Sequence, residues 1–164
     1  MSYSVLHIIV LLGLFACVYQ DIKDRTIHVL WFVVIFIATG LINYELTNDW
    51  IDSVYALLFL IVNISVLFLY TSVKNKRIIN IFQSHLGLGD VLFFIAIIPL
   101  FSVRNFILFF ITGMIVSMIL HLLFNTFQKQ LTIPLAGYLS LFLISILSYS
   151  FISSNYSFLK TDLL

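Results

Sequence analysis

Charged residues are scarce in this sequence. Only 9% of the 164 residues are charged, whereas 62% are hydrophobic, and the mean hydropathy is +1.16. A water-soluble domain of this length has too little interior to bury so much apolar surface, so the surroundings of the chain must be largely lipid. The formal net charge is only +1, which argues against a general electrostatic attraction to nucleic acid.

Cysteine, proline and glycine are also few, with one, two and six residues respectively. The single Cys17 excludes an internal disulfide and a cysteine-cluster metal site, and its apolar surroundings in the sequence predict an inert buried thiol. No repeat or low-complexity linker divides the chain, so we expect one domain over residues 1–164. We expect neither a metal nor a cofactor.

Long apolar runs take the place of the missing charge. There are six: Val5–Tyr19, Ile27–Ile42, Ile51–Tyr70, Gly89–Phe101, Asn105–Phe127 and Ile133–Phe151. The third is close to the roughly 20 residues that a bilayer requires, and Pro99 is expected to kink or end the fourth. The first run has no preceding basic residue and no following cleavage site, which favours a retained helix over a signal peptide. Residues Thr71–His85 are mixed in character and predict a short interfacial helix.

The sequence therefore predicts an all-α integral membrane protein, a bundle of six transmembrane helices with an interfacial helix before the fourth span. Six spans place most of the basic residues on one side: Lys23, Arg25, Lys74, Lys76, Arg77 and Lys129. The positive-inside rule makes that side cytoplasmic and puts both termini outside. Three acids fall on the same side, namely Asp21, Asp24 and Asp90.

Two of these acids are candidates for catalysis. Asp21 ends the first span and Asp90 begins the fourth, 69 positions later, so both lie at one membrane edge. Two close carboxylates share a proton and titrate together. Such a pair can activate water and polarise a peptide carbonyl, as in aspartic proteases. Gly87 and Gly89 leave bare backbone beside Asp90, which an extended substrate segment could pair with.

A simpler interpretation remains open for each acid. Acids at helix ends often reach toward water without any catalytic role, and Asp90 could be a helix N-cap. Intramembrane acids also carry protons or ions in transporters. Asp24 has the pattern of a solvated loop charge, and His85 and His28 that of ordinary interfacial histidines.

Three stretches resemble one family. Asp21-Ile22-Lys23-Asp24-Arg25-Thr26-Ile27 follows the first helix, Gly87-Leu88-Gly89-Asp90 opens the fourth, and Thr132-Ile133-Pro134-Leu135-Ala136-Gly137-Tyr138-Leu139 opens the last. Together they resemble the type IV prepilin peptidases and their preflagellin peptidase relatives, which are membrane aspartic proteases of the Gly-x-Gly-Asp kind. The resemblance covers nearly the whole chain.

This resemblance implies that Asp21 and Asp90 are the catalytic pair. The substrate would be a prepilin-like (type IV pilin or pseudopilin) precursor with a short basic leader and a single apolar helix, cut at the cytoplasmic face of a prokaryotic inner membrane. Some positions depart from the family pattern. Ile27-His28-Val29 replaces Ile-Pro-Asn, Leu92 stands where a lysine is common, and Gly137 replaces a second proline. The paired Cys-x-x-Cys motifs of larger members are missing, so the resemblance implies no zinc site.

Other readings of the sequence stay open. Leu86-Gly87-Leu88-Gly89-Asp90 and Pro134-Leu135-Ala136 also resemble motifs of presenilin and signal peptide peptidase, although those proteases have nine spans and acids in consecutive helices. A small transporter or assembly subunit is a non-enzymatic alternative, as is an inactive scaffold of the peptidase family. The sequence leaves the oligomeric state and any N-methylation of the product open.

Overall fold

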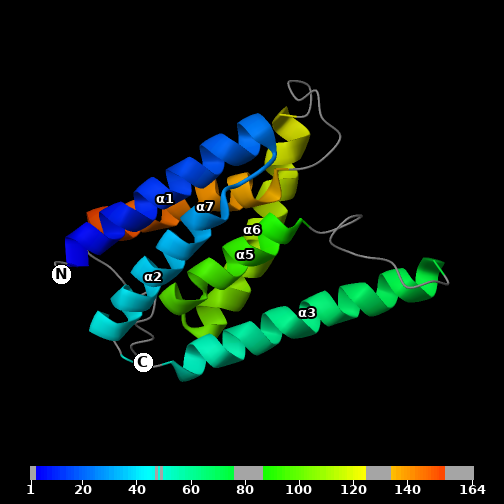
Figure 1. Cartoon of the computed structure of the whole chain (residues 1–164), viewed down its shortest axis with the longest axis horizontal. Helices are drawn as coiled ribbons and strands as arrows, with labels where there is room; N and C mark the ends of the chain where they lie inside the picture. The colour runs from blue at the N-terminus through cyan, green and yellow to red at the C-terminus, as the bar shows by residue number, and fades with distance from the viewer. Residues whose placement is uncertain (1–2, 47, 49, 76–86, 125–133, 154–164) are drawn as a thin grey trace.

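The helices account for nearly all of the structure. The computed structural model describes residues 3–46, 48, 50–75, 87–124 and 134–153. The elements are α1 (Tyr3–Asp24), α2 (Val29–Leu46), α3 (Ile51–Asn75), α5 (Leu88–Ile97), the 3-10 helix η1 (Ile98–Leu100), α6 (Val103–Phe124) and α7 (Leu135–Ser153). The described residues contain no strand, so the predicted all-α class is confirmed (Figure 1).

The described residues contain four candidate membrane spans, where six spans were expected. Four helices are long and apolar enough to cross a membrane, within α1, α2, α3 and α6. The expected fourth and sixth spans correspond to α5 with η1 and to α7, which are shorter apolar helices. Among the described residues the six-span count is therefore not confirmed.

Several helix boundaries differ from those expected. Residues 71–75 of the expected interfacial helix belong to α3, which continues to Asn75 because nothing in Thr71–Asn75 breaks a helix. Residues 76–85 of that prediction lie outside the described part of the chain. Pro99 does end the fourth apolar run, because it lies in η1, where the helix tightens before the chain turns to α6.

The packing of the helices places α1, α2 and α7 side by side, with α5 against α2 and α7. Helix α6 packs on α7, and α3 packs on α6 and η1. In Figure 1, α3 runs along one edge of the bundle, and its C-terminal half diverges from the other helices. The Thr39 hydroxyl ties α2 to α5 by donating to the carbonyl oxygen of Ala96 at 2.8 Å.

The core of the bundle is aliphatic and aromatic. Phe101 stacks on Phe109 with ring centroids 5.2 Å apart, and Phe109 stacks on Phe142 at 5.6 Å. Cys17 is fully buried, as its apolar surroundings in the sequence predicted. Helices α1, α5 and α6 each pack on α7, and this packing fixes the ends of the helices relative to one another.

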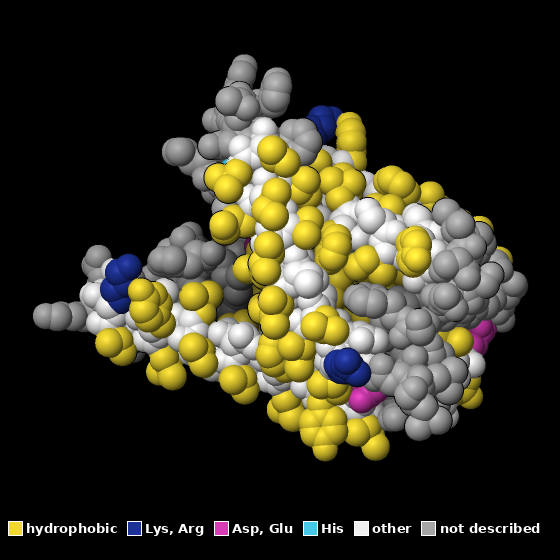
Figure 2. Space-filling model, turned by 180° about the vertical axis from the view of Figure 1, so that it is seen from behind, with side chains coloured by type: hydrophobic (Ala, Val, Ile, Leu, Met, Phe, Trp, Pro, Cys, Tyr) yellow, Lys and Arg dark blue, Asp and Glu magenta, His cyan; other side chains and the backbone are white. Residues whose placement is uncertain are grey.

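The surface of the bundle is also apolar. Large hydrophobic side chains are exposed along every candidate span, for example Leu12 on α1, Leu30 on α2 and Met118 on α6. Figure 2 shows such side chains spread over the face of the molecule with few charged groups among them. Water would not favour so much exposed apolar surface, so this is a multi-pass membrane protein in contact with lipid.

Candidate functional site

Asp21 lies in the last turn of α1. The apolar run predicted the helix, but α1 extends past the expected end at Tyr19 and carries Asp21 with it. The side chain is only 8% exposed. Its Oδ2 atom accepts a hydrogen bond from the backbone N–H of Gly137 at 2.6 Å. A short bond from an amide to a carboxylate is of the strong, charge-assisted kind.

Asp90 lies in the first turn of α5 and is half-buried. The N-cap of this helix is Gly87, so the prediction that Asp90 could itself be the N-cap is wrong. Its carboxylate instead reaches across to α7, where Oδ1 accepts a hydrogen bond from the backbone N–H of Ala136 at 2.9 Å. The acid thus joins α5 to α7.

The two acids meet on the first turn of α7. The donors, Ala136 and Gly137, are consecutive residues, and the nitrogen atoms of neighbouring residues are only about 3 Å apart. The two bonded carboxylate oxygens of Asp21 and Asp90 therefore lie within about 8–9 Å of each other. The first N–H groups of a helix have no partner inside the helix and carry partial positive charge. The start of α7 therefore holds both carboxylates.

Burial and neighbouring charges change the pKa of the Asp90 carboxyl. Asp90 lies outside all four candidate spans. Burial raises the pKa of its carboxyl, and the negative charge of Asp21 raises it further, while the amides of Ala136 and Gly87 act in the opposite direction; the resulting pKa is about 6. Arg25, in the turn after α1, has an electrostatic interaction with Asp21. An acid with this pKa can hold or release a proton near neutral pH.

Two of the glycines leave room for the carboxylates. A Cβ atom at Gly87 would lie 3.0 Å from Oδ2 of Asp90, and one at Gly137 would lie 3.1 Å from Oδ2 of Asp21. At Gly89 a Cβ atom would meet only the Phe32 ring, at an ordinary 3.9 Å. Gly87 and Gly137 therefore allow close approach of the acids, whereas Gly89 has no such local role. Whether Gly87 and Gly89 bind a substrate stays a prediction.

The amides of Ala136 and Gly137 were not among the site residues that the sequence predicted. The stretch was noticed only for its resemblance to a family motif, and Gly137 only as a departure from it. The available signal was Pro134, because a proline directly before a helix marks where free N–H groups begin. Pro134 does precede α7, and its carbonyl accepts the N–H of Tyr138 at 3.1 Å.

Other charged residues lie near the pair at the end of α1 and in the turn that follows it. Asp24 and Lys23 are exposed, and Lys23 donates to the Tyr19 hydroxyl at 3.1 Å. Arg25 has a left-handed backbone with φ 55°, where the chain turns from α1 toward α2. The backbone N–H of His28 donates to Gln20 at 2.9 Å, which closes that turn.

The described residues were searched for groups of side chains that could bind a metal ion, and the chain was compared with known proteins. No group of three or more His, Cys, Asp or Glu side chains that could hold a metal ion occurs within the described ranges. His85 lies outside those ranges. No protein-family model, curated protein or solved structure matches the chain. Together, fold and site define an all-helical membrane protein with two carboxylates held at one helix N-terminus.

Proposed function

We propose that this chain is a membrane aspartic endopeptidase of the type IV prepilin peptidase kind. The observation that supports this most is the pairing of Asp21 and Asp90 on the consecutive amides of Ala136 and Gly137. Those acids come from helices far apart in the sequence, and both belong to stretches that resemble the family's motifs. Acids that only reached toward water would be exposed, whereas Asp21 is 8% exposed and Asp90 is half-buried.

The chemistry follows from two carboxylates with one proton between them. The ionised carboxylate takes a proton from a water molecule while the water oxygen attacks the scissile carbonyl carbon, and the protonated carboxyl polarises the carbonyl oxygen. The tetrahedral intermediate then breaks its C–N bond, and a proton passes to the leaving amine. The raised pKa of Asp90, about 6, allows the pair to hold one proton near neutral pH. Asp90 bonds to α7 through Oδ1 and Asp21 through Oδ2. The second oxygen of each acid takes no part in these two hydrogen bonds.

The substrate is a pilin-like or pseudopilin precursor with a short basic leader and one apolar helix. Lys23 and Arg25 lie close to Asp21 in the chain, and Lys74 lies in the last turn of α3, which runs in the same direction as α1 (Figure 1). Positive residues at one end of membrane helices favour the cytoplasmic side. The cut would therefore fall at the cytoplasmic face of a prokaryotic inner membrane, within pilus assembly or protein secretion.

The test is co-expression with a panel of pilin-like precursors, followed by mass spectrometry of the mature N-terminus. Asp21→Asn and Asp90→Asn should each slow cleavage by at least about 100-fold, since positioned acid–base groups contribute about 10²–10⁴. The matched control is Asp24→Asn, an exposed acid three residues from Asp21, which should cleave normally. Full cleavage by Asp90→Asn, with the protein present in the membrane, would contradict the proposal.

The same experiment separates the rival functions. A presenilin-like protease would cut inside the apolar helix of the substrate, whereas this proposal places the cut before it. A transporter would drive proton-coupled solute flux in liposomes and leave every precursor intact. The mass of the new N-terminus also reveals whether the product is methylated.

A further inference from the structure

Arg25 lies in the turn that joins α1 to α2, directly after the last residue of α1. Its backbone is left-handed, with φ 55°, a conformation in which the Cβ atom crowds the backbone. Helices commonly end in this conformation, but the residue there is usually glycine, which has no Cβ atom. An arginine in this disfavoured conformation indicates that its side chain has a use at this position.

The side chain of Arg25 is more buried than those of its neighbours. Lys23 and Asp24 are exposed, and Lys23 donates a hydrogen bond to the hydroxyl of Tyr19. Arg25 is half-buried, its Nη1 atom is shielded from solvent, and its charge interacts with the buried carboxylate of Asp21. Burial of a cation is tolerated where an opposite charge compensates it, so the position of this side chain agrees with its interaction with Asp21.

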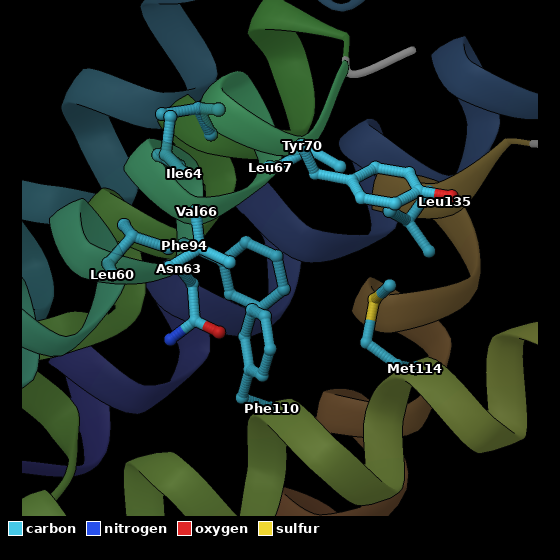
Figure 3. A pocket seen from close by; sticks show the side chains of 11 residues that line it. Leu60, Asn63, Ile64, Val66, Leu67, Tyr70, Phe94, Phe110, Met114 and Leu135 are labelled. Atoms are coloured by element: carbon cyan, nitrogen blue, oxygen red, sulfur yellow. The ribbon is translucent and has the colours of Figure 1, made fainter. Parts of the chain in front are cut away.

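Asp90 lies in different surroundings. The groups that act on its charge are Asp21 and two backbone amides. Val91, the residue after Asp90, lines an apolar cavity of about 390 Å³. The described side chains in the wall of this cavity include Phe94 and Phe110 and none that is charged (Figure 3). Within the described residues, the positive charge in the turn after α1 acts on Asp21 and is not among the groups that act on Asp90.

Other titratable groups also lie around Asp21. On the described parts of the elements next to it, these are Cys17 on α1, Asp90 on α5, His28 before α2 and Tyr138, which follows the Gly137 donor on α7. None of these side chains is a permanent cation, whereas the guanidinium of arginine keeps its charge over the whole range in which a carboxyl titrates. Arg25 therefore supplies a positive charge that is constant with pH.

We propose that Arg25 is a positioning residue for Asp21: its guanidinium keeps the Asp21 carboxylate ionised while the pair holds one proton. This inference rests on the proposed peptidase function and assigns a separate role to each acid. Asp21 accepts the proton of the attacking water, and Asp90 carries the proton that polarises the scissile carbonyl. Arg25 acts through Asp21 and needs no contact with the substrate.

The test is the pH dependence of kcat/KM for a cleaved precursor, which reports the titration of the free enzyme. Arg25→Gln should move the acidic limb of this profile upward by about one pH unit, because a carboxyl group without a nearby cation needs a higher pH to ionise. Below that limb kcat/KM should fall by about tenfold, and at higher pH it should return toward the wild-type value. Arg25→Lys keeps the charge, so its profile should stay close to that of the wild-type protein.

Lys23→Gln is the matched control. It removes one positive charge from the same end of α1, but from an exposed side chain, and it should leave the pH profile unchanged. Equal profiles for Arg25→Gln and the wild-type protein would overturn the inference and leave the proposed function standing. A loss of cleavage by Arg25→Gln that is the same at every pH would also count against it.

A second variant separates the charge from the backbone. Arg25→Gly removes the guanidinium, but glycine adopts a positive φ without strain, so the unfolding temperature in detergent should equal or exceed that of the wild-type protein. Its acidic limb should still move upward, as in Arg25→Gln. A wild-type profile in Arg25→Gly, or unfolding of both variants, would assign Arg25 a purely structural role instead. A precursor panel that the wild-type protein never cleaves overturns both proposals.

Discussion

Gly137 is the position at which the arrangement of the carboxylates can be tested most directly. Gly137→Ala adds one methyl group, which would lie 3.1 Å from Oδ2 and 3.2 Å from Cβ of Asp21. These separations are tighter than ordinary contacts, so Asp21 must shift by a few tenths of an ångström. Asp21 is buried, and α1 packs along α7. The shift should therefore lengthen the 2.6 Å hydrogen bond between the Gly137 N–H and Asp21.

The magnitude follows from two opposing effects. Glycine to alanine in a helix usually stabilises the folded state by about 0.5–1 kcal/mol. A hydrogen bond to a charged group contributes about 1.5–3 kcal/mol, so weakening this one should outweigh the gain. We expect Gly137→Ala to lower the free energy of unfolding by about 1 kcal/mol. If the acids are catalytic, displacement of Asp21 should also slow cleavage by about tenfold or more.

The assay is thermal and denaturant unfolding in detergent, alongside precursor cleavage. Gly40→Ala is the control, because its added methyl group would meet only the Trp50 ring, at 3.4 Å, and alanine should favour the helix there. Gly137→Pro is a second probe: proline is tolerated in a first helical turn but has no N–H for Asp21. If Gly137→Ala is as stable as Gly40→Ala and cleaves normally, Asp21 is not held as we describe.

Two further predictions concern pH and the packing of α5. Because the pKa of Asp90 is raised to about 6 from an ordinary 3.8, the folded protein holds this proton more tightly than the unfolded chain. Its stability should fall as pH rises from about 4 through about 6, and unfolding temperatures should show less of this fall in Asp90→Asn; an unchanged profile would contradict the raised pKa. Thr39→Val removes the hydroxyl bonded to Ala96 and should cost about 1–2 kcal/mol of unfolding free energy. Thr112→Val, whose hydroxyl bonds only within α6, should cost clearly less, and equal losses would argue against the α2–α5 bond.

The helical fold could be predicted because composition alone decides it. In lipid every backbone group must find a partner within the protein, and apolar runs of this length satisfy that requirement as helices. The count of six spans is not confirmed, because α5 ends at Ile97 and Pro99 lies in the 3-10 turn that follows. The position at which α5 ends also depends on the packing of η1 against α2 and α3, and this packing cannot be read from the sequence.

The pairing of the acids was predicted from topology, but not the means by which they are held. Reasoning from helix ends placed Asp21 and Asp90 at the same depth, which leaves their separation across the membrane plane undetermined. Their partners are backbone N–H groups of α7. Every residue except proline has a backbone N–H, so the residue type at position 136 does not indicate that Ala136 is a hydrogen-bond donor to Asp90. The role of Gly87 was not predicted for a similar reason. Gly87 has no side chain, which leaves room for the carboxylate of Asp90, and this closeness is known only from the fold.

Residue 137 must meet two demands at once. It must keep a free N–H, because Asp21 accepts a hydrogen bond from it, and it must lack a side chain, because a Cβ atom would press on the same carboxylate. Alanine meets the first demand only, and proline, which is common at the matching position of the family that the sequence resembles, lacks the N–H. Only glycine meets both. The departure from the family pattern at Gly137 therefore has a structural use in this chain: it gives Asp21 a backbone donor that a proline would not provide.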